Sequence, residues 1–334
     1  MIKDRFYVPK YYKEFKCKGG DCKNTCCKEW NITLTMTDYD KLANLECSDQ
    51  LKEKIKNGVS IFNNATTERY AKIDLNYYGE CKLRLENGYC GLQCECGEEN
   101  IPSVCRYYPR APRLKPVKQC VISLSCEWVL EYLIKDTNKL EFEYQDLSFF
   151  FDKQDEEIKC PQDFLTLRDN SINILTNRSI SLMDRFSNLF KYFNIELNND
   201  TEYNKKMIES LSNFYTHSFS ICDFIKVDNV NNYKDVYNEL KNNVNNFDIY
   251  LEKILINHII YMNFPYIEFN ETFDKSLYGL YYIFLFINQL LYNNIDNLDL
   301  PNILSHFFRV AEHANMYEII YNLKKRIDLE RKNN

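Results

Sequence analysis

The pattern of apolar and polar residues separates the chain into a helical C-terminal part and an irregular N-terminal part. Apolar side chains recur at the spacing of a single helix face in residues 182–190 and again in residues 251–262. Asn-rich stretches and prolines lie between such segments, as is typical of the connections between helices. We therefore expect about six or seven helices beyond residue 163.

Turn-forming residues dominate the first part of the chain. Seven of the eight glycines lie before residue 100, and glycine is typical of tight turns. Residues 37–53 predict one helix, whereas the prolines in residues 103–118 favour an extended chain. The sequence thus predicts a mostly α fold, with an irregular cysteine-rich metal domain at residues 1–130 and a helical domain at residues 131–334.

Charge and hydropathy exclude two classes of partner. The net charge of -6 gives no indication of nucleic-acid binding. The longest apolar run, residues 277–287, is too short for a membrane span, which needs about 20 apolar residues. No apolar segment of a secretory signal follows the first residues. We expect a soluble, cytoplasmic protein that binds neither nucleic acid nor membrane, and its oligomeric state stays open.

Cysteine is the most informative residue type. Twelve of the 14 cysteines precede residue 130, and in a reducing cytosol such a density indicates metal binding or catalysis more than disulfide bonds. A compact motif comprises Cys17, Cys22, Cys26 and Cys27, and a looser set comprises Cys81, Cys90, Cys94, Cys96, Cys105, Cys120 and Cys126. For Cys94, Cys96 and Cys120, the sequence favours neither metal ligation nor packing in the core. The isolated cysteines are expected to pack without metal; they are Cys47, Cys160 and Cys222.

The spacing of the cysteines bears on which metal they bind. Thiolates select zinc, Cu(I) or iron–sulfur clusters, and all four histidines lie outside this region. The C-x2-C knuckles common in zinc sites are absent, and irregular spacing with an adjacent pair fits an iron–sulfur cluster at least as well. The radical S-adenosylmethionine motif C-x3-C-x2-C is also absent, because Glu29 and Gly97 stand where its third cysteine would be. We expect an iron–sulfur cluster, with zinc as the alternative.

Three cysteine-bearing segments carry a family resemblance. The opening block, residues 15–35, reads FKCKGGDCKNTCCKEWNITLT. The second block, residues 81–110, reads CKLRLENGYCGLQCECGEENIPSVCRYYPR, and the third, residues 123–128, reads SLSCEW. Together these blocks resemble the flagellin lysine N-methylases, part of a wider group of cysteine-cluster proteins thought to chelate zinc or iron. The chain departs from the family in the longer gaps of its opening motif and in Glu127, where the family has proline.

The resemblance implies a cofactor set and a substrate. It implies a cluster of the 4Fe–4S type, S-adenosylmethionine as methyl donor and lysines of flagellin as methyl acceptors. Carried over position by position, it points to eight metal ligands: Cys17, Cys22, Cys26, Cys27, Cys81, Cys90, Cys105 and Cys126. The function expected is N-methylation of flagellin lysines. The alternatives are a non-catalytic zinc- or iron-binding module for protein interaction, and an electron-transfer protein.

Basic and aromatic residues next to the second block are candidates for binding the cofactor. Arg106 and Arg110 could bind a carboxylate or face an anionic cluster, because the guanidinium group suits planar carboxylate recognition. Tyr107 and Tyr108, with Tyr77 and Tyr78, could form an aromatic wall for a methylammonium product. Three carboxylates remain equal candidates for the base that takes the lysine proton, and the catalytic residue is not assigned. They are Asp74, Glu80 and Glu127.

Overall fold

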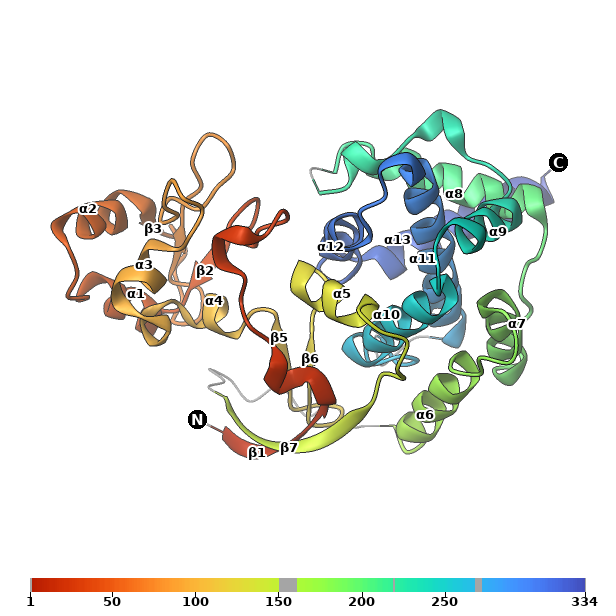
Figure 1. The fold of residues 1–334 in the computed structure, drawn as a ribbon, viewed down its shortest axis with the longest axis horizontal. Helices are drawn as coiled ribbons and strands as arrows, with labels where there is room; N and C mark the ends of the chain where they lie inside the picture. Colours follow the sequence, from red (N-terminus) through yellow and green to blue (C-terminus); the bar gives the residue numbers. More distant parts are fainter. Residues whose placement is uncertain (1, 150–160, 219, 268–271, 334) are drawn as a thin grey trace.

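The structure, a computed structural model, describes residues 2–149, 161–218, 220–267 and 272–333 (Figure 1). The fold is mostly α, as predicted: thirteen α-helices and seven strands lie within these residues. Eight of the helices begin beyond residue 163, at least one more than the hydrophobic pattern predicts.

A small lobe holds the first four helices and a three-stranded sheet. Its elements are β2 (Ile32–Leu34), α1 (Met36–Ala43), α2 (Asp49–Gly58), β3 (Val59–Ile61), β4 (Ala71–Ile73), α3 (Gly91–Cys96), η3 (Glu98–Asn100) and α4 (Ser103–Tyr107). The strand order is β2-β4-β3, and both pairings are antiparallel. Apolar side chains between residues 32 and 101 give this lobe a hydrophobic core of its own.

The remaining helices form a larger helical body, which stands beside the small lobe (Figure 1). Its α-helices are α5 (Glu127–Ile134), α6 (Phe164–Leu175), α7 (Leu182–Tyr192), α8 (Thr201–Tyr215), α9 (Tyr233–Asn243), α10 (Phe247–Tyr261), α11 (Phe273–Asn293), α12 (Leu300–Ala311) and α13 (Met316–Lys332). Short 3-10 helices are η4 (Cys222–Phe224), η5 (Val227–Asn229) and η6 (Ile295–Asn297). No helix within the described ranges is long and apolar enough to cross a bilayer.

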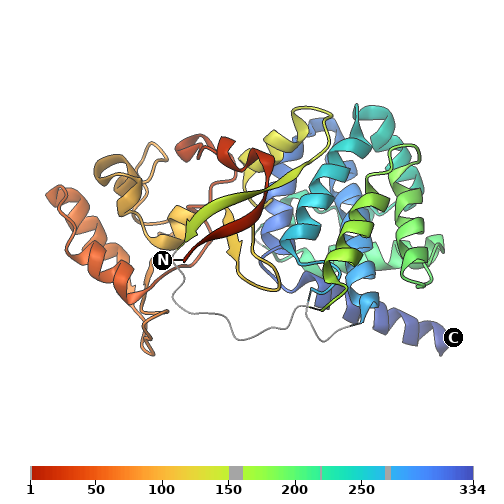
Figure 2. The same ribbon diagram turned by 90° about the horizontal axis from the view of Figure 1, so that it is seen from below.

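A four-stranded sheet lies between the small lobe and the helical body (Figure 2). Its strands, in the order β5-β6-β1-β7, are β5 (Arg110–Arg113), β6 (Gln119–Ile122), β1 (Ile2–Pro9) and β7 (Phe142–Phe149). β1 pairs antiparallel with β7 along its whole length and parallel with β6, and η1 (Lys10–Glu14) follows β1. Apolar residues of β1 and β6 belong to the core of the helical body. The domain boundary at residue 130 stays a prediction.

Two local predictions for the small lobe were wrong. Residues 37–53 do not form one helix, because Asn44 ends α1 and Ser48 begins α2 by accepting a hydrogen bond from the Leu51 amide. Residues 103–118 are not extended throughout, since Ser103 starts the short helix α4. The Asp38 carboxylate fixes that start, accepting hydrogen bonds from the Ser103 amide at 3.0 Å and from its hydroxyl at 2.7 Å.

Candidate metal centre

One cavity brings together all eight cysteines that the sequence predicts as metal ligands. This cysteine cavity encloses about 130 Å³ and is lined by residues of the small lobe, of the loop before it and of the start of α5. Its thiols are those of Cys17, Cys22, Cys26, Cys27, Cys81, Cys90, Cys105 and Cys126. Every cysteine in the described ranges is free of disulfide bonds, so these thiols are available as ligands.

Four of the eight thiols, which we name the lobe group, pack with the core of the small lobe. They are Cys27, Cys81, Cys90 and Cys105. Backbone pairing fixes their positions: the Cys81 amide donates to the Cys27 carbonyl at 2.8 Å, and an isolated β-bridge joins Arg84 to Cys90. Cys105 comes from α4, which packs against β2.

The other four thiols, which we name the junction group, lie where the loop of residues 17–26 meets α5. They are Cys17, Cys22, Cys26 and Cys126. Cys126 is the N-cap residue of α5. The next residue, Glu127, is buried and holds the loop by an ion pair to Lys18 at 2.6 Å and by accepting the Asn24 amide at 2.9 Å.

Burial disfavours ionisation of most of these thiols. It raises the pKa of Cys22 and of Cys126 to about 12. Cys27 differs, because a hydrogen bond from the Cys26 thiol stabilises its thiolate and lowers its pKa. Thiolates are the form that binds metal, and a bound cation would supply the charge that lets the remaining thiols ionise. The donor set therefore fits a soft metal centre.

Arg309 on α12 is a functional candidate that sequence reasoning missed. Its side chain is only 4% exposed, and its guanidinium donates to the carbonyls of Thr25 at 2.5 Å and Lys28 at 3.3 Å, on either side of Cys26 and Cys27. Its Nε has no hydrogen-bond partner within the described residues. A thiolate-bound centre, which is anionic, would suit this buried cation. In the sequence, the signal for this role is a single arginine among apolar residues of a helical segment.

The two arginines predicted to bind the cofactor both line the cysteine cavity. The guanidinium of Arg110 lies 4.8 Å from the ring centre of Phe15, and that of Arg106 lies 5.4 Å from the ring centre of Tyr107. In the described part of the chain, neither arginine forms an ion pair with a carboxylate. Both cations are therefore available to an anionic ligand in the cavity.

The four tyrosines do not form one aromatic wall. Tyr108 lines the cavity, where its hydroxyl lies 3.0 Å from that of Ser125. Tyr107 is absent from the lining and meets the ring of Phe149 edge to face. Tyr77 and Tyr78 are 97% and 74% exposed and also lie outside the cavity lining. Only Tyr108 is placed to contact a ligand of the cavity.

Of the three carboxylates considered as a base, only Glu127 lines the cavity. Burial raises its pKa, but the ion pair with Lys18 and the Asn24 amide outweigh burial and leave the pKa lowered. A carboxylate held ionised in this way is a weak proton acceptor. Asp74 and Glu80 are not among the lining residues. The catalytic base thus stays unassigned.

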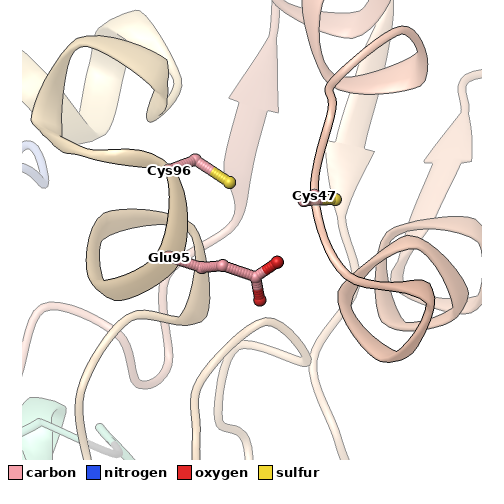
Figure 3. A group of neighbouring side chains, drawn as sticks. All are labelled: Cys47, Glu95 and Cys96. Atoms are coloured by element: carbon pink, nitrogen blue, oxygen red, sulfur yellow. The ribbon is translucent and has the colours of Figure 1, made fainter.

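A smaller donor group lies outside the cysteine cavity. The sulfur atoms of Cys47 and Cys96 and a carboxylate oxygen of Glu95 lie within 4.8 Å of one another (Figure 3). The same carboxylate accepts hydrogen bonds from the amide and the hydroxyl of Ser48, the N-cap residue of α2. Glu95 therefore has a structural role whether or not a metal is bound here.

Three further cysteines of the described ranges lie outside both donor groups. Cys94 is exposed on α3, and Cys222 lies beside the Asp223 carboxylate. Cys120 is buried on β6, where its thiol faces the Tyr12 hydroxyl at 3.8 Å. Cys160 lies outside the described residues.

Part of the chain is similar to three curated proteins. Two curated proteins named lysine-N-methylase, from Salmonella typhimurium and Salmonella choleraesuis, are each 27% identical to this chain over 134 residues. The matched stretch is 40% of this chain and 33% of each relative, so it spans about a third of their length. A flagellar biosynthetic protein FliU from Salmonella muenchen is also 27% identical over 134 residues, which are 78% of its length.

No family model and no solved structure matches the chain. The matches to the curated relatives agree with the resemblance of the three cysteine-bearing blocks. These curated relatives support the resemblance of the chain to the flagellin lysine N-methylases.

Proposed function

We propose that this protein is a cytoplasmic, S-adenosylmethionine-dependent methyltransferase that methylates lysine side chains of flagellin. An iron–sulfur cluster bound in the cysteine cavity would lie close to the methyl donor. One observation carries the proposal: the eight cysteines to which the resemblance points converge on a single cavity, which is also lined by two arginines that form no ion pair within the described residues. The names of the curated relatives, lysine-N-methylase and flagellar biosynthetic protein, support the reaction and the substrate.

The methyl donor, S-adenosylmethionine, would be bound by the arginines that line the cavity. Its amino-acid carboxylate would match the planar fork of Arg106 or Arg110; both side chains line the cavity, and neither forms an ion pair within the described residues. Its sulfonium group would lie against apolar lining residues, which exclude water from the reacting methyl group. The cluster, when bound, would supply an anionic and redox-active centre at this place.

The acceptor lysine must lose its proton before it can attack the methyl group. A free lysine has a pKa of about 10.4, and transfer into a poorly hydrated cavity lowers it. The apolar side chains of the lining and the cations Arg106 and Arg110 would disfavour the ammonium form. The hydroxyl of Tyr108, which lines the cavity, would orient the amine.

The test is methyl transfer by the anaerobically purified full chain. The protein, labelled S-adenosylmethionine and flagellin are incubated together, and flagellin peptides are analysed for methylated lysines by mass spectrometry. We expect label on lysines only when all three components are present. Binding of S-adenosylmethionine is measured separately by calorimetry.

Two arginine variants sharpen the test. Arg110→Ala should weaken donor binding by about 10- to 100-fold, the loss expected for a charged hydrogen bond of about 1.5–3 kcal/mol. Arg113→Ala is the matched control, because Arg113 is not among the cavity-lining residues and its guanidinium lies over the ring of Tyr261. A chain that carries metal but binds no S-adenosylmethionine would refute the proposal and leave a non-catalytic metal-binding module.

A further inference from the structure

A second set of metal-binding side chains lies on the small lobe, outside the cysteine cavity. Cys47 lies in the connection between α1 and α2, and Glu95 and Cys96 are the last two residues of α3. Both side chains of α3 extend towards the segment that carries Cys47 (Figure 3). None of the three residues lines the cysteine cavity. The group is therefore distinct from the candidate metal centre described above.

The three donor atoms lie close enough together to share one ion. Two sulfur atoms and a carboxylate oxygen lie within 4.8 Å of one another, and no other three His, Cys, Asp or Glu side chains among the described residues meet this condition. Two thiolates on a tetrahedral zinc ion lie about 3.8 Å apart, given a Zn–S distance of about 2.3 Å. Small rotations of the side chains would therefore bring these donors to ligand distance.

Both thiols of this group are available and stand on ordered backbone. Neither Cys47 nor Cys96 forms a disulfide bond, and both are half-buried against the hydrophobic core of the small lobe. The Asn100 side-chain amide donates to the Cys96 carbonyl at 2.6 Å, and the Gly97 amide donates to the Gln93 carbonyl at 3.2 Å. These bonds fix the end of α3, so little conformational entropy is lost when an ion binds there.

Hydrogen bonds from Ser48 hold the Glu95 carboxylate in place. The Ser48 amide donates to one carboxylate oxygen, and its hydroxyl donates to the other at 2.9 Å. An ionised carboxylate has about four acceptor sites, so both oxygens keep a free lone pair for a metal. Carboxylates that bind metals are oriented by hydrogen bonds of this kind. The third donor is thus positioned before any ion binds.

The local charge also favours a cation. Residues 85–105 contain four glutamates and neither lysine nor arginine. Binding of a metal ion requires both thiols to ionise, which brings two thiolates and one carboxylate together. A divalent ion would offset most of this negative charge.

We propose that Cys47, Glu95 and Cys96 bind a zinc ion, which joins the α1–α2 connection to the end of α3. Two thiolates and a carboxylate suit zinc, whereas Cu(I) selects soft ligands and an iron–sulfur cluster takes cysteine thiolates. Glu95 is exposed, so a water molecule takes the fourth position of the tetrahedron. The inference depends neither on methyl transfer nor on which centre occupies the cysteine cavity.

The zinc ion acts on the same short helix that carries a thiol of the cavity. Cys90, which lines the cysteine cavity, is the N-cap residue of α3, and the two zinc ligands of α3 lie at its other end. A helix of six residues is too short to be stable by itself. The ion therefore stabilises the helix that positions Cys90.

Zinc content tests the site with variants that leave the cavity unchanged. The full chain is purified anaerobically and dialysed against buffered zinc, and bound zinc is counted per chain. Cys47→Ala and Cys96→Ala should each bind about one zinc ion fewer than the wild type. Cys94→Ala is the matched control, because Cys94 is exposed beside Glu95 and outside the donor group. Equal zinc contents in all four proteins would overturn the proposal.

A second pair of variants tests the carboxylate. Ser48→Ala removes a hydrogen bond to Glu95 and should weaken zinc binding about 10- to 100-fold, the cost of losing a partner of a metal ligand. Thr35→Ala is its control, since Thr35 caps α1 as Ser48 caps α2 and lies outside the donor group. Wild-type zinc affinity in Ser48→Ala would overturn the assignment of Glu95 as a ligand.

Thiol labelling tests the site in the wild type, without a variant that could fail to fold. The anaerobic chain is treated with iodoacetamide in the presence and absence of zinc, and labelled cysteines are identified by mass spectrometry. Zinc should protect Cys47 and Cys96 together and leave Cys94 reactive. Equal labelling of Cys47 and Cys96 under both conditions, or a disulfide bond between them in the reduced preparation, would overturn the zinc site.

Discussion

Replacing Arg309 by methionine tests whether a residue of the helical body organises the cysteine cavity. In the native chain the buried guanidinium donates to the carbonyls of Thr25 at 2.5 Å and Lys28 at 3.3 Å. Methionine has a similar length and no donor, so Arg309→Met leaves both carbonyls without their partner. The loop that carries Cys26 and Cys27 should then lose its anchor on α12.

The size of the effect follows from the two hydrogen bonds. A hydrogen bond to a charged group contributes about 1.5–3 kcal/mol, and the longer bond to Lys28 should contribute less than the bond to Thr25. Removal of the buried charge offsets part of this loss, because Arg309 is desolvated and its Nε is unpaired within the described residues. We expect a net loss of about 2–3 kcal/mol in the free energy of unfolding.

Urea unfolding and the rate of iron release to a chelator measure the two consequences. Arg309→Met should unfold at lower urea concentration and release iron at least roughly tenfold faster, since about 1.4 kcal/mol corresponds to tenfold. Arg168→Met is the matched control: its side chain is 5% exposed and lies over the ring of Tyr7, outside the cavity lining. If both variants kept the wild-type rate of iron release, Arg309 would have no role in holding the metal ligands.

Three further changes test the helical body. Glu252→Gln should lower the free energy of unfolding by about 3–5 kcal/mol, because the buried Arg185, which lies 2.7 Å from the Glu252 carboxylate, loses its counter-charge. Urea unfolding measures this change, and an unaltered midpoint would contradict the prediction. Burial lowers the pKa of His306 to about 4. Below about pH 6.5 the unfolded chain therefore binds a proton at this histidine and the folded chain does not, so the free energy of unfolding should fall between about pH 6.5 and pH 4. His306→Gln should flatten this part of the pH–stability curve, and an unchanged slope would exclude His306 as its cause. Gly279→Ala should lower the Tm, because the alanine Cβ would lie 2.1 Å from the Tyr317 ring and overpacking costs about 1–3 kcal/mol. A wild-type Tm in calorimetry would show that α11 and α13 can move apart without loss of stability.

Prediction from the sequence succeeded where the signal was local and repeated. Residues 182–190 and 251–262 lie almost wholly within α7 and α10, because apolar positions at helical spacing specify a buried face over several turns. The prediction for residues 37–53 failed because two caps, Asn44 and Ser48, outweigh the helical pattern between them.

Local patterns in the sequence could not predict which strands pair. β1 and β7 pair from Ile2 with Phe149 to Pro9 with Phe142, which joins the start of the chain to a segment far along it. Short strands of mixed polarity have no strong period, and their pairing depends on contacts distant in the sequence. The sheet nevertheless positions the cavity, because β6 leads directly into Cys126 and α5.

The sequence by itself determined the chemistry of this protein: a mostly helical chain whose clustered cysteines, without neighbouring histidines, provide a soft ligand set. Its three cysteine-bearing blocks also carried the resemblance to the flagellin lysine N-methylases. Only the tertiary structure decided which thiols line one cavity, and how Arg309 contacts the backbone around the adjacent pair. The physical reason is that ligation geometry depends on the packing of segments far apart in the chain, whereas ligand type is a property of each side chain alone.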